Sequence, residues 1–118
     1  PAVVRAGIEM ACLDAAGKAL KLPVYKLLGG KTRDTIPFGA YVFYRYKDER
    51  TGIGGECDTA SILERTKELC RRHGFTAIKL KGGVYSPQEE FKAIAAIAAE
   101  FPDYPLRWDP NAAWSVET

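Results

Sequence analysis

Small and apolar residues recur at helical spacing near the start of the chain, at Val4, Ile8, Cys12, Ala15 and Ala19. This spacing predicts a helix from Pro1 to about Leu20. Pro23 suits the first turn of a second, short helix, and Gly29-Gly30 suits its end. Residues 1–30 are therefore expected to form a helical hairpin.

Three later segments have the composition of β-strands. The first is the aromatic and apolar stretch Thr35–Tyr44, with Pro37 near its start, where a missing hydrogen-bond donor is tolerated. Phe75–Lys81 is the second and is closed by Gly82-Gly83, and Leu106–Asp109 is the third.

Each gap between these strands carries the signals of one helix. Asp58 can cap a helix, and apolar residues follow it at helical spacing until Gly74 ends the pattern. Ser86-Pro87-Gln88-Glu89 is a capping box with proline at the first helical position, and it predicts a helix that runs to about Glu100.

The predicted order is a helix pair followed by strand, helix, strand, helix and strand. Strands that alternate with helices of this length imply right-handed crossovers and a parallel sheet. The repeat is about 30 residues long, close to one eighth of the ~250 residues of a (β/α)8 barrel. A doubly wound open sheet fits the same spacing, so periodicity alone leaves both α/β architectures open.

Composition and charge narrow the class of protein. The chain has 118 residues, of which 47% are hydrophobic and 27% charged, and its net charge is +2. These values are typical of a soluble domain and predict neither a nucleic-acid nor a membrane partner. No run of apolar residues approaches a membrane span. The three cysteines show no CxxC spacing, which favours reduced thiols in a cytoplasmic protein.

Both ends of the sequence fall within predicted helices. Pro1, rather than a methionine, opens directly into a helical pattern. Ser115 can cap a helix, but almost nothing follows it before Thr118. The chain is therefore expected to be an internal piece of a longer protein.

Two lysines in the second predicted strand are candidates for chemistry. Alternation places Lys79 and Lys81 on one face of the strand, with Ile78 and Leu80 on the other. Because the apolar pair should face the helices, the lysines should point to the other layer, which in a barrel is the interior.

Their spacing favours loss of a proton from one lysine. Cα atoms two residues apart on a strand are about 6.8 Å apart. At an effective dielectric constant near 20, two positive charges at that separation repel by roughly 2.4 kcal/mol. A general base needs a neutral amine, and this repulsion favours one. The alternative is a pair of solvated lysines on an edge strand.

Asp109 ends the third predicted strand, one repeat after the lysines. A carboxylate at the carboxyl end of a parallel strand is placed to bind a hard cation such as Mg²⁺. It should also converge on one site with the lysines. The alternative is that Asp109-Pro110-Asn111 is a turn whose side chains cap local backbone groups.

These motifs together resemble a known family. Ile78-Lys79-Leu80-Lys81-Gly82-Gly83-Val84, followed by Trp108-Asp109-Pro110-Asn111-Ala112-Ala113-Trp114, resembles the mandelate racemase/muconate-lactonizing branch of the enolase superfamily, and most of all its glucarate dehydratase group. Residues 9–30 resemble the helical segment that precedes the barrel in that branch.

The resemblance implies a fold with two parts. Residues 1–33 would be the helical segment that links a capping domain to the barrel. Residues 34–118 would be the first three β/α units of an incomplete (β/α) barrel, so the fold class is α/β.

The resemblance also implies residue roles. Lys81 would remove the proton alpha to a substrate carboxylate, and Lys79 would tune and orient Lys81. Asp109 would be the first of the Mg²⁺ ligands, and Asn111 would contact the substrate or metal-bound groups. The later metal ligands and the opposing His–Asp pair would lie outside these residues, so the chain alone is expected to be inactive. His73 is expected to be only a helix-end residue.

The implied function is a Mg²⁺-dependent sugar-acid dehydratase acting on a sugar diacid, within a cytoplasmic homo-oligomer. Two alternatives remain. One is another member of the branch, such as a galactarate or other sugar-acid dehydratase, an epimerase or a cycloisomerase. The other is a non-catalytic structural or interaction fragment.

Two further features carry less functional weight. The aromatic residues Tyr41, Phe43, Tyr44 and Tyr46 are expected mostly in the core, although they could line a substrate mouth. The charged segment Arg45–Arg50 is expected to be a solvated loop.

Overall fold

A computed structural model describes residues 2–117. Two compact units make up the chain, Pro1–Ile36 and Pro37–Thr118. Pro1 and Thr118 themselves lie outside the described residues, so the predicted helix start at Pro1 is not described. The two units are taken in turn below.

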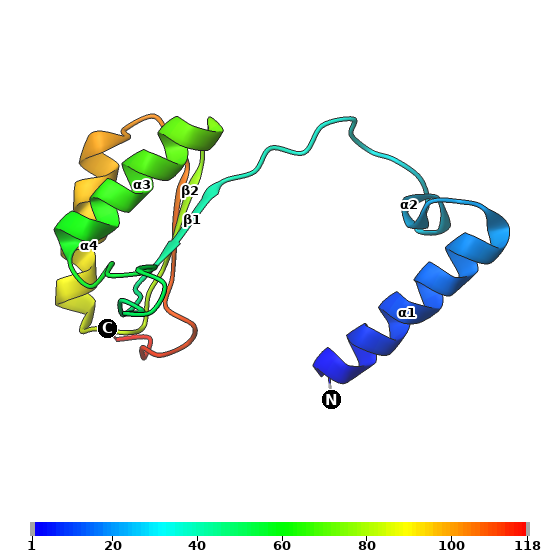
Figure 1. The fold of residues 1–118 in the computed structure, drawn as a ribbon, viewed down its shortest axis with the longest axis horizontal. Coiled ribbons are helices and arrows are strands. Elements are labelled where there is room, and N and C mark those ends of the chain that lie inside the picture. Colours follow the sequence, from blue (N-terminus) through cyan, green and yellow to red (C-terminus); the bar gives the residue numbers. More distant parts are fainter. Residues whose placement is uncertain (1, 118) are drawn as a thin grey trace. The chain divides into compact units, whose positions relative to one another are not determined.

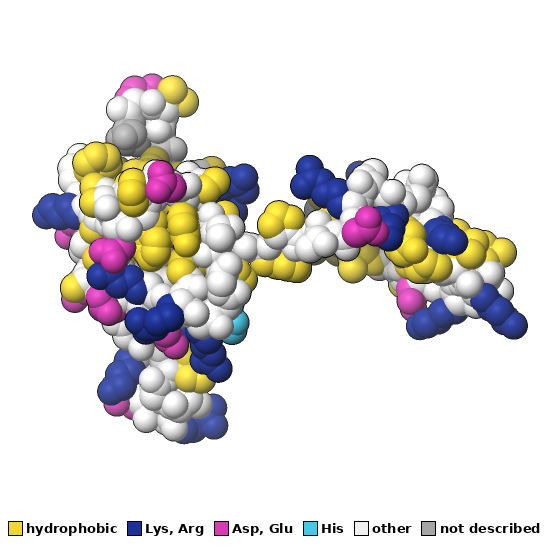
Figure 2. Space-filling model, turned by 90° about the horizontal axis from the view of Figure 1, so that it is seen from above, with side chains coloured by type: hydrophobic (Ala, Val, Ile, Leu, Met, Phe, Trp, Pro, Cys, Tyr) yellow, Lys and Arg dark blue, Asp and Glu magenta, His cyan; other side chains and the backbone are white. Residues whose placement is uncertain are grey.

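The first unit contains α1 (Ala2–Leu20) and the short α2 (Val24–Leu27), which agrees with the predicted hairpin. Gly17 is its buried residue, and a Cβ there would lie 2.8 Å from the carbonyl oxygen of Leu22, so the close turn needs glycine. The apolar positions of α1 are mostly exposed, as Figure 2 shows by the hydrophobic side chains at the surface. No helix among residues 2–117 combines the length and apolarity needed to cross a membrane.

The second unit is built on a parallel sheet of β1 (Ala40–Phe43), β2 (Ile78–Lys81) and β3 (Leu106–Asp109), in that order. The third strand has its predicted bounds, whereas the first two are shorter than predicted. Residues 35–39 and 75–77 lie outside the ladder. They are apolar enough for a strand, but ladder pairing begins at Ala40 and Ile78, so only four residues of each strand are paired.

The helices α3 (Thr59–His73) and α4 (Pro87–Glu100) begin and end as predicted. Asp58 accepts a hydrogen bond from the backbone N–H of Ser61 at 2.8 Å, and Gly74 adopts the left-handed conformation that ends α3. Ser86 forms its predicted capping box with Glu89. Ser115–Glu117, in contrast, is not helical: the backbone N–H of Glu117 donates to the Ser115 hydroxyl in a local turn.

Both helices cover the same face of the sheet (Figure 1). The core lies between these layers and consists of Ala40, Val42, Ile62, Cys70, Ile78, Leu80, Ala93 and Ile97. A doubly wound sheet has helices on both faces, whereas consecutive parallel strands with helices on one face are the arrangement of a (β/α) barrel. The second unit therefore has barrel architecture, with the opposite face of the sheet uncovered.

Candidate active site

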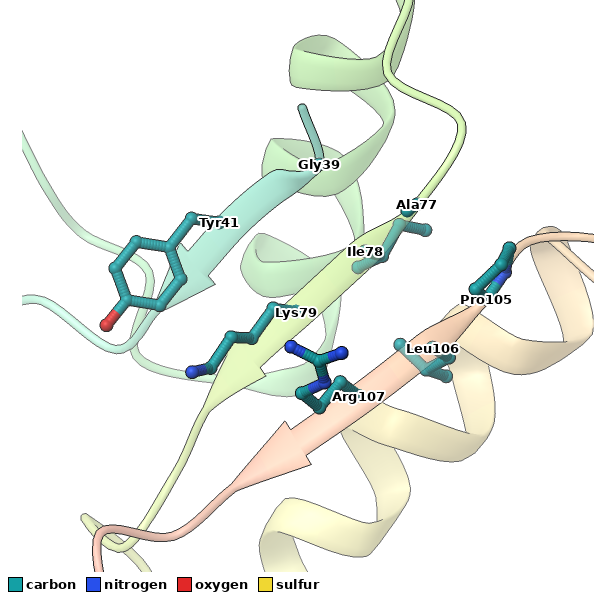
Figure 3. A pocket seen from close by; sticks show the side chains of 8 residues that line it. All are labelled: Gly39, Tyr41, Ala77, Ile78, Lys79, Pro105, Leu106 and Arg107. Atoms are coloured by element: carbon teal, nitrogen blue, oxygen red, sulfur yellow. The ribbon is translucent and has the colours of Figure 1, made fainter. Parts of the chain in front are cut away.

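The uncovered face of the sheet presents its side chains in rows across the three strands. Lys79 pairs in register with Tyr41 of β1 and Arg107 of β3. Figure 3 shows these three side chains on the same face, around an open depression of about 320 Å³. Their neighbours on β2, Ile78 and Leu80, are buried against the helices. The predicted orientation of the lysines is therefore confirmed.

The next row brings the predicted charged groups together. Lys81 stands in register with Asp109, and its Nζ donates to Asp109 Oδ2 at 2.7 Å. Lys79 Nζ lies 2.9 Å from the same oxygen. All three side chains are partly buried, with Lys81 the least exposed at 20%. The predicted convergence of the three groups at the carboxyl ends of β2 and β3 is confirmed.

Sharing one carboxylate oxygen changes the electrostatics expected from the lysines alone. Hydrogen bonds from Lys81, then Lys79, then the backbone N–H of Asn111 hold the pKa of Asp109 well below its usual range. The repulsion between two lysines considered in isolation is offset, because the anion stands between them. The trio carries a net charge of +1 rather than +2.

Asn111 contributes its backbone to this arrangement. Its N–H donates to Asp109 Oδ1 at 3.0 Å, and both Asn111 and Ala112 have a φ of 56°. The turn that was the alternative interpretation of Asp109-Pro110-Asn111 is thus present, alongside the contacts between Asp109 and the lysines. A role for the Asn111 side chain toward substrate or metal stays a prediction.

Most of the aromatic residues in and just after β1 are exposed, which corrects the expectation that they lie in the core. Tyr41 is 51% exposed and Tyr46 is 83% exposed, and Phe43 is also exposed, whereas Tyr44 is partly buried. The reason is alternation: Ala40 and Val42 occupy the covered face, so Tyr41 and Phe43 point to the open one. Lys79 Nζ lies 5.8 Å from the centroid of the Tyr41 ring, within the range of a cation–π contact.

The loop after β1 is exposed from Tyr46 to Arg50, as predicted, and differs from the prediction at Arg45. Arg45 donates from Nε to Glu56 Oε2 at 2.9 Å, and Glu56 is buried. This pair closes the base of the loop, and the hydrogen bond from Arg45 lowers the pKa of Glu56. Arg45 also lies over the Phe43 ring at 5.2 Å, so its prediction as a solvated residue is wrong.

The described residues offer Mg²⁺ one carboxylate at this edge of the sheet. No three His, Cys, Asp or Glu side chains within residues 2–117 gather closely enough to hold a metal ion. Mg²⁺ takes an octahedral set of oxygen ligands. His73 is the last residue of α3, as predicted, and it belongs to no such cluster among the described residues. Asp109 can therefore be one ligand of a metal site, but these residues do not complete one.

Two families match this chain. Residues 2–29 match the family described as "Mandelate racemase / muconate lactonizing enzyme, N-terminal domain", and residues 61–118 match "Enolase C-terminal domain-like". These two matches fall in the two compact units.

Individual relatives agree with these matches. A probable glucarate dehydratase of Streptomyces coelicolor is 50% identical over 122 residues, covering 98% of this chain and 28% of that protein. A chloromuconate cycloisomerase of Cupriavidus pinatubonensis is 37% identical over 120 residues, covering 99% of this chain and 28% of that protein. The crystal structure of an enolase from Pseudomonas fluorescens Pf0-1 with bound magnesium, potassium and tartrate is 38% identical, with a TM-score of 0.79 over 94% of this chain and 27% of that one. The chain thus spans about a quarter of the length of these relatives.

Proposed function

Since the chain belongs to the enolase superfamily, and within it to the glucarate dehydratase group, we propose that the complete protein is a Mg²⁺-dependent sugar-acid dehydratase. Its substrate is a sugar diacid of the glucarate type. The enzyme removes the proton alpha to a carboxylate and eliminates the beta hydroxyl as water.

One observation carries the proposal: two ammonium groups lie within 2.9 Å of a single carboxylate oxygen at the ends of adjacent parallel strands. In barrels of this type the active site lies at that end of the strands. A lysine base beside a metal-binding carboxylate is the combination that enolase-superfamily sites use for carboxylate substrates.

The residues have distinct proposed roles. Lys81 is the base that takes the alpha proton on Nζ, and Lys79 is the neighbouring cation that orients it. Asp109 holds both lysines in place and supplies one metal ligand. Mg²⁺, when bound, stabilises the extra negative charge that proton removal places on the substrate carboxylate. The remaining ligands and the acid that assists loss of the hydroxyl come from outside residues 1–118.

The substrate class rests on the relatives. The 50%-identical protein is a probable glucarate dehydratase, and tartrate, a hydroxy diacid, is bound in the Pseudomonas fluorescens structure. The cycloisomerase relative makes proton abstraction next to a carboxylate the more general part of the proposal. A cytoplasmic location and a homo-oligomeric assembly remain predictions for the complete protein.

The test is a substrate comparison on the complete protein, or on a chimera in which residues 1–118 replace the matching quarter of the Streptomyces coelicolor relative. With Mg²⁺ present, glucarate should give a keto-deoxy sugar acid, and chelation of the metal should stop the reaction. Turnover of muconate or of a dipeptide in place of any sugar diacid would assign the chain to another activity of the superfamily.

A further inference from the structure

Glu90 is a buried carboxylate that the proposed chemistry does not use. It lies in the first turn of α4 and is 0% exposed. Its Oε1 accepts the backbone N–H groups of Val84 and Tyr85 at 2.8 and 2.9 Å. Its Oε2 accepts the backbone N–H of Gly83 at 2.9 Å and the indole Nε1–H of Trp108 at 3.3 Å. No lysine or arginine in the described part of the chain forms an ion pair with it.

A buried charge without an ion-pair partner is costly unless hydrogen bonds compensate it. Here three consecutive backbone N–H groups and one indole do so, and bonds of this kind to a charged acceptor are the stronger ones. The loop that follows β2 is therefore shaped around Glu90. Gly82 belongs to the same arrangement, because a Cβ there would lie 2.0 Å from Glu90 Oε2.

The positions of these four donors connect Glu90 to both strand ends of the site. Gly83 comes two residues after Lys81, and Trp108 immediately precedes Asp109. The backbone N–H of Gly82 also donates to the carbonyl oxygen of Asp109 at 3.0 Å. One side chain of α4 thus fixes the backbone at the end of β2 and at the end of β3.

We propose that Glu90 is a positioning residue that sets the distance between the Lys81 ammonium and the Asp109 carboxylate. Glu90 does not reach the open face of the sheet and does not touch substrate; it acts through the backbone and through Trp108. Its catalytic consequence rests on the proposed function, whereas its effect on the Lys81–Asp109 contact does not.

The variant Glu90→Gln tests this with little change in shape. The amide keeps one acceptor oxygen and turns the other position into a donor that faces N–H groups. Ile97→Ala is the matched control, because Ile97 is a fully buried apolar residue two turns further along the same helix, and its truncation lowers stability through a cavity. Should Glu90→Gln fail to fold, Trp108→Phe removes one of the four donors and should show a smaller effect in the same direction.

The first readout does not require activity. In the 118-residue chain, Glu90→Gln should accelerate amide hydrogen exchange at Gly83, Val84 and Tyr85, and it should weaken the Lys81–Asp109 contact, measured at neutral pH as a shift of the carbon NMR resonance of the Asp109 side-chain carboxyl. Ile97→Ala should leave both unchanged. An Asp109 carboxyl resonance that is the same in Glu90→Gln and wild type would overturn the proposal.

The second readout is kcat in the chimera at a temperature where all variants are folded. Glu90→Gln should lower kcat roughly 100-fold, as small misplacements of a reacting group do, with KM little changed, whereas Ile97→Ala should keep kcat close to wild type. Equal losses in both variants would reduce Glu90 to a purely structural role. If wild type itself has no activity but the Asp109 carboxyl resonance still responds to Glu90→Gln, the proposed function fails and the positioning role stands.

Discussion

At the scale of single residues, Asp109 is the centre of the candidate site because both of its oxygens are engaged. Oδ2 receives the two lysine ammonium groups, and Oδ1 receives the backbone N–H of Asn111. These partners stabilise the ionised carboxylate, so Asp109 stays charged at pH values where an ordinary aspartate is protonated.

Removal of either lysine should therefore be visible in the titration of Asp109. In Lys81→Met the pKa of Asp109 should rise toward 3.8, because the hydrogen bond from Lys81 is the largest cause of its depression. Lys79→Met should raise it less, and Lys92→Met, at an exposed position of α4, should not change it. Carbon NMR of the side-chain carboxyl measures all three.

The same depression has a consequence for stability. A folded-state pKa below the unfolded value of 3.8 stabilises the fold above that pH, and the contribution is lost as the pH falls below it. The acid-induced loss of stability should therefore be smaller in Lys81→Met than in wild type. An identical pH dependence in the two proteins would mean that the ion pair does not form in solution.

Tyr44 should titrate at the opposite end of the pH scale. Its burial, reinforced by the charge of Glu90, raises its pKa from 10.0 to about 12. Between these pH values the unfolded state loses the phenol proton and the folded state keeps it, so the free energy of unfolding should fall as the pH rises from 10 to 12. Tyr44→Phe should reduce that fall, whereas Tyr46→Phe, at an exposed position, should not. Urea denaturation at a series of pH values provides the measurement.

At the scale of secondary-structure elements, the helices of the second unit were predictable because their ends have local chemical causes. Asp58 and Ser86 accept backbone N–H groups, and Gly74 adopts a positive φ. The first two strands were overestimated, because a strand ends where its neighbour stops pairing, and residues 35–39 and 75–77 do not reveal that in their composition.

The candidate site, too, has features that the sequence predicts and features that it does not. Alternation along β2 and the repeat length were enough to predict that Lys79, Lys81 and Asp109 lie together, as they do. The same alternation, applied to β1, would have placed Tyr41 on the open face. The hydrogen bonds that Glu90 accepts could not be predicted, because they depend on how the backbone of the loop after β2 bends around the Glu90 carboxylate.

Loss of one helix cap should have a local and measurable cost. Ser86→Ala removes the hydroxyl that accepts the backbone N–H of Glu89, which should lower the free energy of unfolding by about 1 kcal/mol. Gln88→Ala, at an exposed position in the same turn, is the control and should change it little. Urea denaturation followed by fluorescence reports on this unit, because both tryptophans lie within residues 37–118. Equal effects of the two substitutions would argue against the cap.

At the scale of the whole molecule, each unit leaves apolar surface uncovered. Val4 and Ile8 of α1 are exposed in the first unit, and Phe43 and Phe91 in the second. Hydrophobic side chains are visible at the surface in Figure 2. The open face of the sheet carries the candidate site, and the relatives are several times longer than this chain.

The isolated chain should accordingly be inactive. One carboxylate cannot hold Mg²⁺ in a catalytic geometry, so purified residues 1–118 should show no turnover of glucarate at any Mg²⁺ concentration. Calorimetric titration should likewise find no saturable Mg²⁺ site. The chimera with the Streptomyces coelicolor relative is the positive control, and turnover by the isolated chain would show that the site is complete without additional residues.

The central claim, that Lys81 removes a proton alpha to a carboxylate, is tested most directly by isotope exchange. The chimera is incubated with glucarate and Mg²⁺ in deuterium oxide, and NMR follows the incorporation of deuterium at the alpha carbon of the remaining substrate. Wild type and Lys92→Ala should incorporate deuterium at similar rates. In Lys81→Ala the rate of incorporation should fall by a factor of at least about a thousand, as expected when a general base is removed. Exchange that continues unchanged in Lys81→Ala would contradict the account.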